Sequence, residues 1–399
     1  MPHTKRYRIQ QIQTNDRSFV VDWDDGHQSR FHWIWLRDNG LVETTFAAGT
    51  SQRVVDAASI PPDIKPLRHG IREDGSLHID WDDGETAAFD PRWLRNHCYS
   101  KAERQHRSAR PRLWTAEIIN ELPALTFSEF QNDDGLFRWL GLLTDFGFAL
   151  LRDVPTDVGQ VKEVANKIGF VRETNYGRVF DVESKPRTGH LAYTPVGLAA
   201  HTDNPYRDPV LGIQLLHCLQ ASPTGGESIF VDGFRVAEEL RETDRDAFEV
   251  LARVPRQFEY REEGTDLRHE TTLIHVNLAG EVVGVRYNDR AASTLSVPEE
   301  YVEPFYNAYR KFVSLLRDPL FELRFKLEAG DLIIFDNERL LHGRTGFNPD
   351  DGARHLQGCY VDRDGVASRL RVLATRLDVH GLDPGIPGGA RLEESAAHA

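Results

Sequence analysis

The stretch "GDLIIFDNERLLHGR" (residues 330–344) shows the pattern that decides the fold. An apolar run, Leu332–Phe335, ends in a polar turn, and an apolar pair then leads into His-Gly-Arg. Short apolar runs bounded by turn residues are typical of buried strands. Further runs of this kind recur between about residues 126 and 380, for example "LGIQLLHCL" (211–219), "GESIFVDGF" (226–234) and "RHLQGCYVDRDG" (354–365).

Many short strands at fairly even spacing predict a mainly β domain, a double-sheet jelly roll with helices packed outside. The helical pattern predicts four flanking segments: Ser128–Leu143, Val158–Ile168, Asp232–Val250 and Pro298–Leu316. We expect this domain to span residues 126–380, after a polar, basic connector at 101–125. The Gly/Pro-rich residues 381–399 predict a flexible tail.

The first hundred residues contain an internal repeat and predict a small β-rich N-terminal domain. "VDWDDGHQSRFHWIWLRDN" (21–39) and "IDWDDGETAAFDPRWLRNH" (79–97) share W-D-D-G, then Phe, then W-L-R, at a constant offset of 81 − 23 = 58 residues. Each unit predicts a strand, an Asp-Gly turn and a second strand that carries the aromatic residues. The motif "HID" at His78–Asp80 belongs to this repeat, so we expect it to be structural.

Composition excludes several classes of protein. The net charge of −14 and the pI near 5.6 argue against a nucleic-acid or anionic-membrane surface. Three widely spaced cysteines provide no disulfide framework and fit a reducing compartment. The N-terminus has no apolar signal region, and no run approaches eighteen apolar residues. We therefore expect a cytoplasmic protein.

A second His-x-Asp motif, "HTDNP" (201–205), predicts a metal site. Residues two apart in an extended segment point to the same face, so His201 and Asp203 can present an imidazole and a carboxylate to one point. His342, at the end of the opening stretch, is the best third ligand. Two His and one carboxylate form the facial triad of non-heme Fe(II) oxygenases, which leaves positions for a chelating 2-oxo acid and O2.

The same pattern predicts a site for the far carboxylate of that 2-oxo acid. Arg354 follows His342 by 354 − 342 = 12 residues, and a guanidinium binds a carboxylate through two parallel hydrogen bonds. Ser228 in "TGGESIF" adds a hydroxyl after a glycine pair that lets the backbone come close. This ordered set predicts an Fe(II)- and 2-oxoglutarate-dependent dioxygenase with His201, Asp203 and His342 as catalytic metal ligands.

The sequence resembles the γ-butyrobetaine hydroxylase/trimethyllysine hydroxylase family of Fe(II)/2-oxoglutarate dioxygenases, which is related to taurine dioxygenase. The resemblance covers nearly the whole chain and is carried by motifs such as "WLRDN" (35–39), "HTDNP" (201–205), "TGGESIFVDGF" (224–234), "FDNERLLHGR" (335–344) and "RHLQGCY" (354–360). It implies a double-stranded β-helix catalytic domain behind the small N-terminal domain, and commonly a homodimer.

The resemblance also implies a pocket for a trimethylammonium group, because a quaternary cation is best met by aromatic ring faces. Four residues match positions of such a cage: Tyr176, Phe180, Tyr193 and Tyr360. At the other end of the substrate, Asn288 matches a donor for the anionic head. His190 and Asn204 stand where Asn and Tyr are usual, and Arg286 and Arg290 lie close in sequence, so the pocket is expected to be more basic.

The implied reaction is hydroxylation of a small betaine, best γ-butyrobetaine to L-carnitine. The alternatives are 2-trimethylaminoethylphosphonate, whose phosphonate suits a more basic pocket, and trimethyllysine. The sequence departs from the family in the N-terminal domain, where relatives often bind zinc. The ligand positions fall near Gly40, Val42, Thr45 and Glu85, which cannot form a tetrahedral zinc site, so we predict no zinc.

Overall fold

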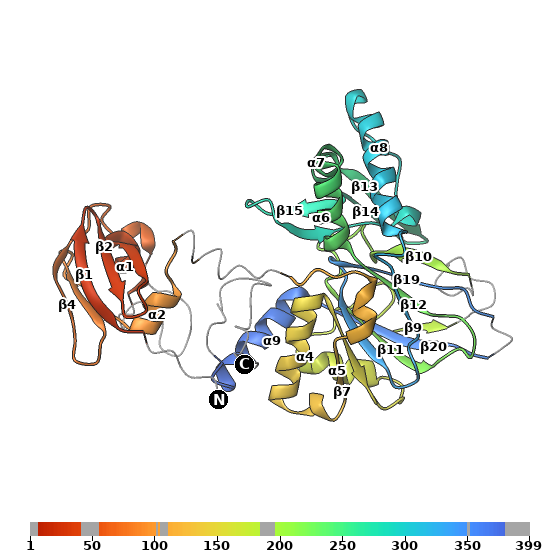
Figure 1. Ribbon diagram of the computed structural model, residues 1–399, viewed down its shortest axis with the longest axis horizontal. Helices are drawn as coiled ribbons and strands as arrows, with labels where there is room; N and C mark the ends of the chain where they lie inside the picture. Colours follow the sequence, from red (N-terminus) through yellow and green to blue (C-terminus); the bar gives the residue numbers. More distant parts are fainter. Residues whose placement is uncertain are drawn as a thin grey trace. The chain divides into compact units, whose positions relative to one another are not determined.

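The computed structural model describes residues 7–40, 56–100, 103, 111–183, 196–348 and 352–379 (Figure 1). The chain divides into two compact units, one made of Met1–Ala109 with Val379–Ala399 and the other of Arg110–Asp378. Within the described part of the chain, no helix is both long enough and apolar enough to cross a membrane.

The N-terminal unit contains two three-stranded antiparallel sheets, one from each copy of the repeat. The first has the order β1-β2-β3 and the second β4-β5-β6. Their bounds are β1 Ile9–Asn15, β2 Ser18–Trp23, β3 Gln28–His32, β4 Pro66–Ile71, β5 Leu77–Trp81 and β6 Thr86–Phe89. The core of this unit is aromatic, since five large rings are at most 1% exposed: Phe19, Trp23, Phe31, Trp81 and Phe89. His78 pairs with Asp80 on β5 and belongs to this structural repeat.

One expectation for the repeat was wrong, because its second tryptophans lie in short helices and not in strands. Trp35 is in α1 (Trp33–Asn39), and Trp93 is in α2 (Pro91–Asn96). Asp90 caps α2, since its carboxylate accepts a hydrogen bond from the Trp93 backbone N–H at 3.0 Å, and Pro91 occupies the first turn. A capping Asp followed by Pro is a helix-start signal, which the aromatic pattern concealed.

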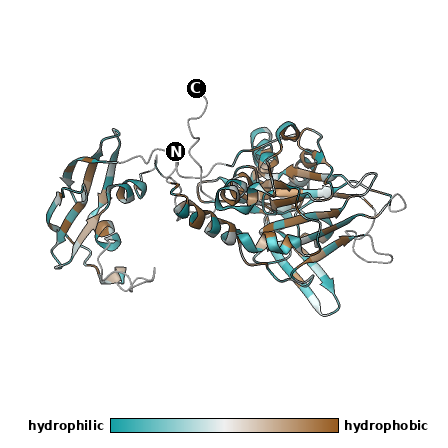
Figure 2. Cartoon of the chain, turned by 90° about the horizontal axis from the view of Figure 1, so that it is seen from below, coloured by the Kyte–Doolittle hydropathy of each residue, from teal (hydrophilic) through white to brown (hydrophobic). Residues whose placement is uncertain are grey.

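The second unit is a strand-rich core with helices outside, as the sequence predicted. A six-stranded sheet has the order β7-β8-β18-β11-β20-β9, and a four-stranded sheet has the order β10-β19-β12-β17. The bounds are β7 Ala124–Thr126, β8 Phe148–Arg152, β9 Phe180–Glu183, β10 Leu198–His201, β11 Ile213–Gln220, β12 Ser228–Asp232, β17 Leu323–Phe325, β18 Leu332–Asp336, β19 Leu340–Arg344 and β20 His355–Val361. Hydrophobic and hydrophilic residues are interleaved along the strands (Figure 2).

Two groups of helices flank these sheets. α4 (Asp133–Phe146) and α5 (Gln160–Ile168) pack against the six-stranded sheet, and α9 (Arg363–Arg376) packs against both helices. The second group has its own apolar core and consists of α6 Gly233–Thr243, α7 Arg245–Arg253 and α8 Glu299–Leu316, with the hairpin β15 Ile274–Val276/β16 Val282–Val285. A further hairpin is formed by β13 Arg256–Glu262 and β14 Thr265–Thr271. Short 3-10 turns are η1 Ala57–Ser59, η2 Ala116–Glu121, η3 Glu129–Gln131 and η5 Asp289–Ala291.

Two segments differ from the pattern read from the sequence. The helix expected over 232–250 is two helices, because the Asp244 side chain accepts a hydrogen bond from the Ala247 backbone N–H at 3.0 Å and starts α7 anew. Residues 111–125, expected in the connector, pack onto the second unit. Trp114 is 6% exposed, and its indole N–H donates to the Phe146 carbonyl at 2.7 Å.

A buried ion pair fixes the turn between β18 and β19 against β12. Arg339, in that turn, donates from Nε and Nη2 to the two carboxylate oxygens of Asp232 at 3.1 and 2.8 Å. The Arg339 and Asp232 side chains are 2% and 0% exposed. Arg339 also donates to the Asp145 and Arg112 carbonyls. A bidentate pair with its remaining donors satisfied holds the end of β12 and the start of β19 in one place.

We predict that Asp232→Ala lowers the free energy of unfolding by about 3–5 kcal/mol, because it leaves the Arg339 charge buried without its partner. Denaturant unfolding followed by circular dichroism measures this. The matched control is Asp266→Ala, which removes the exposed pair with Arg268 and should change stability by about 1 kcal/mol or less. Equal effects for the two variants would show that the buried pair does not hold the turn.

Candidate functional site

The pairing of β10 with β19 brings two of the predicted ligands together. The strands are antiparallel, and His201 and His342 are directly opposite each other in the register. Their ring centroids are 4.6 Å apart. Opposed residues in an antiparallel pair point to the same face of the sheet, so the two imidazoles leave the strands side by side.

Asp203 joins them because the turn that precedes His342 also holds the backbone of Asp203. Asn337, in that turn and 1% exposed, accepts from the Asp203 backbone N–H at 2.7 Å and donates to its carbonyl at 3.0 Å. It also donates to the Leu211 carbonyl at 2.8 Å. One buried amide therefore fixes the carboxylate of the motif relative to the strand that carries His342.

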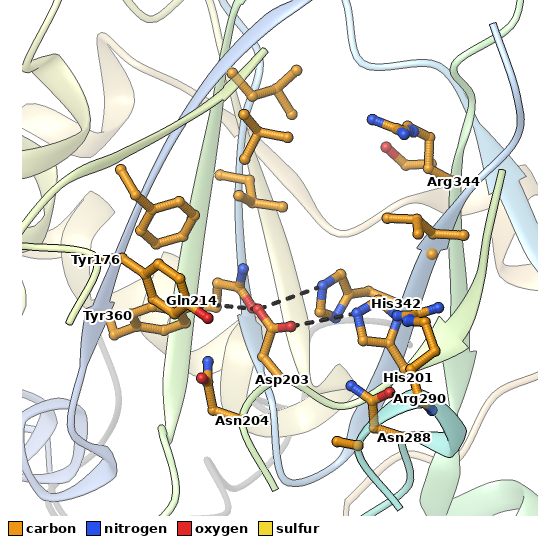
Figure 3. Close-up of a pocket in the computed structure, with 18 of the residues that line it drawn as sticks. Tyr176, His201, Asp203, Asn204, Gln214, Asn288, Arg290, His342, Arg344 and Tyr360 are labelled. Carbon is orange, nitrogen blue, oxygen red and sulfur yellow. Dashed lines mark hydrogen bonds and ion pairs between the residues drawn. The ribbon is translucent and has the colours of Figure 1, made fainter. Parts of the chain in front are cut away.

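The three side chains converge on one point (Figure 3). His201 Nε2 lies 3.4 Å from one carboxylate oxygen of Asp203, and His342 Nε2 lies 3.9 Å from the other. One ligand atom from each residue lies within 4.8 Å of the other two. In the part of the chain that the structure describes, no other group of His, Cys, Asp or Glu side chains meets this condition.

The protonation states suit a metal ion. Burial alone would raise the pKa of Asp203, but His342, His201 and the Tyr360 hydroxyl hold it well below its usual value. Burial lowers the pKa of His342 to about 3. His201 Nδ1 lies 2.9 Å from the Ala199 carbonyl, which favours a proton there and leaves the Nε2 lone pair toward Asp203. A charged carboxylate and neutral imidazoles are what metal ligation requires, and this donor set fits Fe(II).

The triad lies in a cavity of about 410 Å³, one end of which is aromatic. Three of the four residues expected in the cage line it: Tyr176, Phe180 and Tyr360. The Phe180 and Tyr360 rings stack with centroids 5.1 Å apart. Tyr360 also donates from its hydroxyl to Asp203 at 2.9 Å, so one residue contacts both the metal-binding carboxylate and the aromatic end.

A second end of the cavity is strongly basic. Arg354 is 8% exposed, Ser228 is 6% exposed, and both line the cavity. A Cβ at Gly226 would lie 3.3 Å from the Arg354 side chain, so the glycine allows the backbone to approach the guanidinium. Arg344 joins them on β19, and burial together with the charge of Arg354 lowers the pKa of Arg344 to about 10. Two adjacent buried cations suit an anionic group such as a carboxylate.

The third end lies near Asn288 and Arg290, which Figure 3 shows on the side of Asp203 away from Tyr176 and Tyr360. Asn288 uses its side chain locally, donating to the Thr202 carbonyl at 3.3 Å and accepting from the Arg290 backbone N–H at 3.2 Å. The asparagine therefore positions Arg290. Arg290 is exposed as a residue, its side chain lines the cavity, and it has no ion pair among the described residues.

The remaining predicted residues have different placements. Asn204 lines the cavity and accepts a hydrogen bond from the Tyr206 hydroxyl at 2.5 Å. Arg286, expected to make the pocket more basic, is 7% exposed and does not line the cavity; its charge faces Glu338 and Asp208 instead. Four predicted positions lie outside the described residues: Val42, Thr45, His190 and Tyr193.

Several lining residues did not emerge from the sequence. Arg344 and Gln214 could have been predicted from strand spacing. Arg344 lies two residues after His342, and Gln214 lies two residues before Leu216, so each points to the same face as another lining residue. Gln214 is 2% exposed, and its Oε1 has no hydrogen-bond partner in the described part of the chain. Tyr206 and Tyr260 also line the cavity, and Tyr260 comes from the distant β13–β14 hairpin, which no local pattern places there.

Comparisons with known proteins agree with this geometry. Residues 106–360 match the model of the taurine catabolism dioxygenase TauD, TfdA family. Residues 10–71 and 69–139 each match the γ-butyrobetaine hydroxylase-like N-terminal model. The chain is therefore an Fe(II)- and 2-oxoglutarate-dependent dioxygenase.

The curated relatives narrow the family further. The chain is 40% identical to γ-butyrobetaine dioxygenase of Pseudomonas sp. (strain AK-1), over 88% of this chain and 93% of that protein. It is 33% identical to the Homo sapiens γ-butyrobetaine dioxygenase over 93% and 98%, and 35% identical to the Gallus gallus mitochondrial trimethyllysine dioxygenase over 86% and 83%. The protein belongs to the γ-butyrobetaine/trimethyllysine dioxygenase family.

We predict that Asn337→Ala weakens binding of a divalent metal by about 10- to 100-fold, because an outer residue that orients a ligand is lost. Titration of the metal-free protein with Mn(II), followed by electron paramagnetic resonance, measures the dissociation constant without turnover. Asn120→Ala, at an exposed position, is the matched control. Unchanged affinity in Asn337→Ala would show that Asp203 is held by other contacts.

Proposed function

We propose that His201, Asp203 and His342 hold the Fe(II) ion of this dioxygenase. The support is the convergence of their ligand atoms in a cavity that also contains basic and aromatic ends. The bound iron, with 2-oxoglutarate and O2, supplies the oxidising power that hydroxylates an unactivated C–H bond and yields succinate and CO2. The protein binds, orients and shields the reactants.

Arg354 and Ser228 are proposed to hold the far carboxylate of 2-oxoglutarate, with Arg344 beside them. Arg354 has no carboxylate partner among the described residues, although it is 8% exposed. A buried, unpaired cation is costly, so its usual state is expected to be paired with a bound anion. The planar guanidinium accounts for the choice of arginine over lysine at this position.

The proposed substrate is a small trimethylammonium compound, best γ-butyrobetaine, with L-carnitine as the product. The observation that carries this proposal is that two ends of the cavity lie on opposite sides of the triad. One end is lined by the aromatic rings, and the other contains Arg290. A zwitterion with a quaternary cation and an anionic head would lie between them. Holding both ends determines which carbon faces the metal.

A second candidate, 2-trimethylaminoethylphosphonate, is favoured by Arg290 itself. A phosphonate has a third oxygen and more negative charge than a carboxylate. An arginine without an ion pair can donate a hydrogen bond to the extra oxygen and balance the extra charge. Trimethyllysine remains a third candidate, since the relatives at 34–35% identity include trimethyllysine dioxygenases.

A succinate-release screen tests the function directly. The purified protein with Fe(II), 2-oxoglutarate and O2 is given γ-butyrobetaine, 2-trimethylaminoethylphosphonate, trimethyllysine or taurine. Succinate release that depends on γ-butyrobetaine, with hydroxylated product found by mass spectrometry, supports the first candidate. Release with taurine alone would overturn the trimethylammonium proposal.

The triad and the 2-oxoglutarate site are separable by mutation. Asp203→Ala should abolish turnover, whereas Arg354→Ala should raise the apparent KM for 2-oxoglutarate by about tenfold or more, since a charge-assisted hydrogen bond contributes about 1.5–3 kcal/mol. Steady-state kinetics at varied 2-oxoglutarate measures both. Arg268→Ala on the exposed hairpin is the control. Activity in Asp203→Ala would refute the ligand assignment.

The anionic end is tested by Arg290→Gln, which keeps a donor and removes the charge. We expect the KM for 2-trimethylaminoethylphosphonate to rise by about tenfold or more, and that for γ-butyrobetaine to rise less, because the phosphonate has the greater charge. The KM for 2-oxoglutarate should not change. Equal KM values for wild type and variant with both compounds would remove Arg290 from the substrate site.

We infer three further properties from the family resemblance and the composition: a homodimer, a cytoplasmic location and the absence of zinc. Light scattering of the purified protein gives the mass in solution, and a monomer mass at micromolar concentration would contradict the dimer. Metal analysis by mass spectrometry tests the absence of zinc, which stoichiometric zinc would contradict.

A further inference from the structure

The β13–β14 hairpin contributes an aromatic side chain to the cavity from a part of the chain far from the metal motifs. Tyr260 lies on β13, is partly buried and lines the cavity. Among the described strands, the hairpin is a separate two-stranded sheet with no neighbour in either core sheet. Its position over the cavity therefore depends on contacts outside the core sheets, namely side-chain contacts and a backbone bridge from Phe258 to Ala292.

Tyr260 packs into the aromatic end through two ring contacts. It stacks on Tyr206 with centroids 5.1 Å apart and an interplanar angle of 19°. It meets Tyr176 edge to face at 6.4 Å and 61°. Tyr206 is 7% exposed and also lines the cavity. The predicted cage residue Tyr176 is thus in contact with the stacked pair of Tyr206 and Tyr260, which come from two other segments.

A polar chain anchors the hairpin at this place. Asn175 donates to Glu262 on β13 at 3.4 Å, and Arg207 donates to Asn175. Burial, followed by contacts with Glu262 and with the Tyr176 hydroxyl, raises the pKa of Tyr260 far above its usual value, so the phenol stays neutral. Three segments, around residues 175, 207 and 260, are therefore joined at the edge of the aromatic end.

We propose that Tyr260, backed by Tyr206, forms an additional wall of the trimethylammonium site and is a specificity-determining residue for the quaternary cation. The inference rests on the proposed function. A quaternary ammonium offers no N–H donor, so its binding energy comes from ring faces around it, each contributing about 0.5–2 kcal/mol. Stacking on Tyr206 holds the Tyr260 ring in place before the ligand binds, which reduces the entropy lost on binding.

The same strand joins the two ends of the substrate site. Phe258, two residues before Tyr260, bridges to Ala292, and the Ser293 backbone N–H donates to the Gln257 carbonyl at 2.9 Å. Ala292 directly follows the 3-10 turn Asp289–Ala291, which carries Arg290. The distance between the cation-binding rings and the anion-binding arginine is therefore fixed by one short strand, which matches recognition of a zwitterion of defined length.

The test compares a charged ligand with its neutral shape analogue. The probes are γ-butyrobetaine, 2-trimethylaminoethylphosphonate and 5,5-dimethylhexanoate, in which carbon replaces the quaternary nitrogen of γ-butyrobetaine. Calorimetric titration of the protein loaded with Fe(II) and 2-oxoglutarate, without O2, gives dissociation constants free of turnover. The variants are Tyr260→Leu and Tyr260→Phe. Tyr301→Leu, at an exposed position on α8, is the control.

We expect Tyr260→Leu to weaken binding of both trimethylammonium compounds by about tenfold, and Tyr260→Phe by about threefold or less, because the ring face remains. Binding of 5,5-dimethylhexanoate should change by about twofold or less, since leucine replaces much of the apolar area. The control should match wild type with all three probes. Tyr260→Met is made in parallel, with thermal melting, in case leucine destabilises the hairpin.

The outcomes separate the two proposals. If no trimethylammonium compound binds the wild type, the proposed function fails, and the role of Tyr260 fails with it. If both bind and Tyr260→Leu and Tyr260→Met bind them as tightly as wild type does, only the role of Tyr260 is overturned. Equal weakening for γ-butyrobetaine and 5,5-dimethylhexanoate would also overturn it, because the ring would then act only as apolar packing.

Discussion

The site depends on the close antiparallel approach of β10 and β19. His201 and His342 are opposite each other only in this register, and a shift of one residue would turn one imidazole to the other face of the sheet. Gly343 makes the approach possible, since a Cβ there would lie 2.5 Å from the Leu198 carbonyl oxygen. The glycine of the His-Gly-Arg motif is thus a steric requirement of the metal site.

The turn that leads into β19 holds neighbouring parts of the cavity in place relative to this strand pair. Asn337 holds the backbone of Asp203, and Arg339 is locked to Asp232 at the end of β12. Both side chains are at most 2% exposed, so water cannot replace their bonds. Asn337 and Arg339 are therefore buried anchors within a turn, which explains how a turn can position a metal ligand with the precision of a strand.

Sequence reasoning succeeded where spacing along one strand decides which way a side chain points. The predicted triad, Arg354 and Ser228 all line one cavity, because each lies on a strand or within two residues of a strand end. Sequence reasoning failed where a turn changes the direction of the chain: Arg286 and Arg290 are neighbours in sequence, but the 3-10 turn at Asp289–Ala291 places only Arg290 at the cavity. Tyr260 had no signal, since only tertiary packing brings the hairpin to Tyr176.

The cavity is lined by more basic than acidic side chains, whereas the chain as a whole is negatively charged. The protein has a net charge of −14, yet Arg290, Arg344 and Arg354 line the cavity, and Asp203 and Glu259 are the lining acids. A divalent ion would outweigh the single negative charge of Asp203 in the triad, so the cavity with its two basic ends would attract anions and repel free cations. For the proposed zwitterion, ring faces supply a site for the quaternary cation that adds no negative charge to compete for the arginines. Neutral rings beside two basic ends would thus let the proposed zwitterion and 2-oxoglutarate bind together.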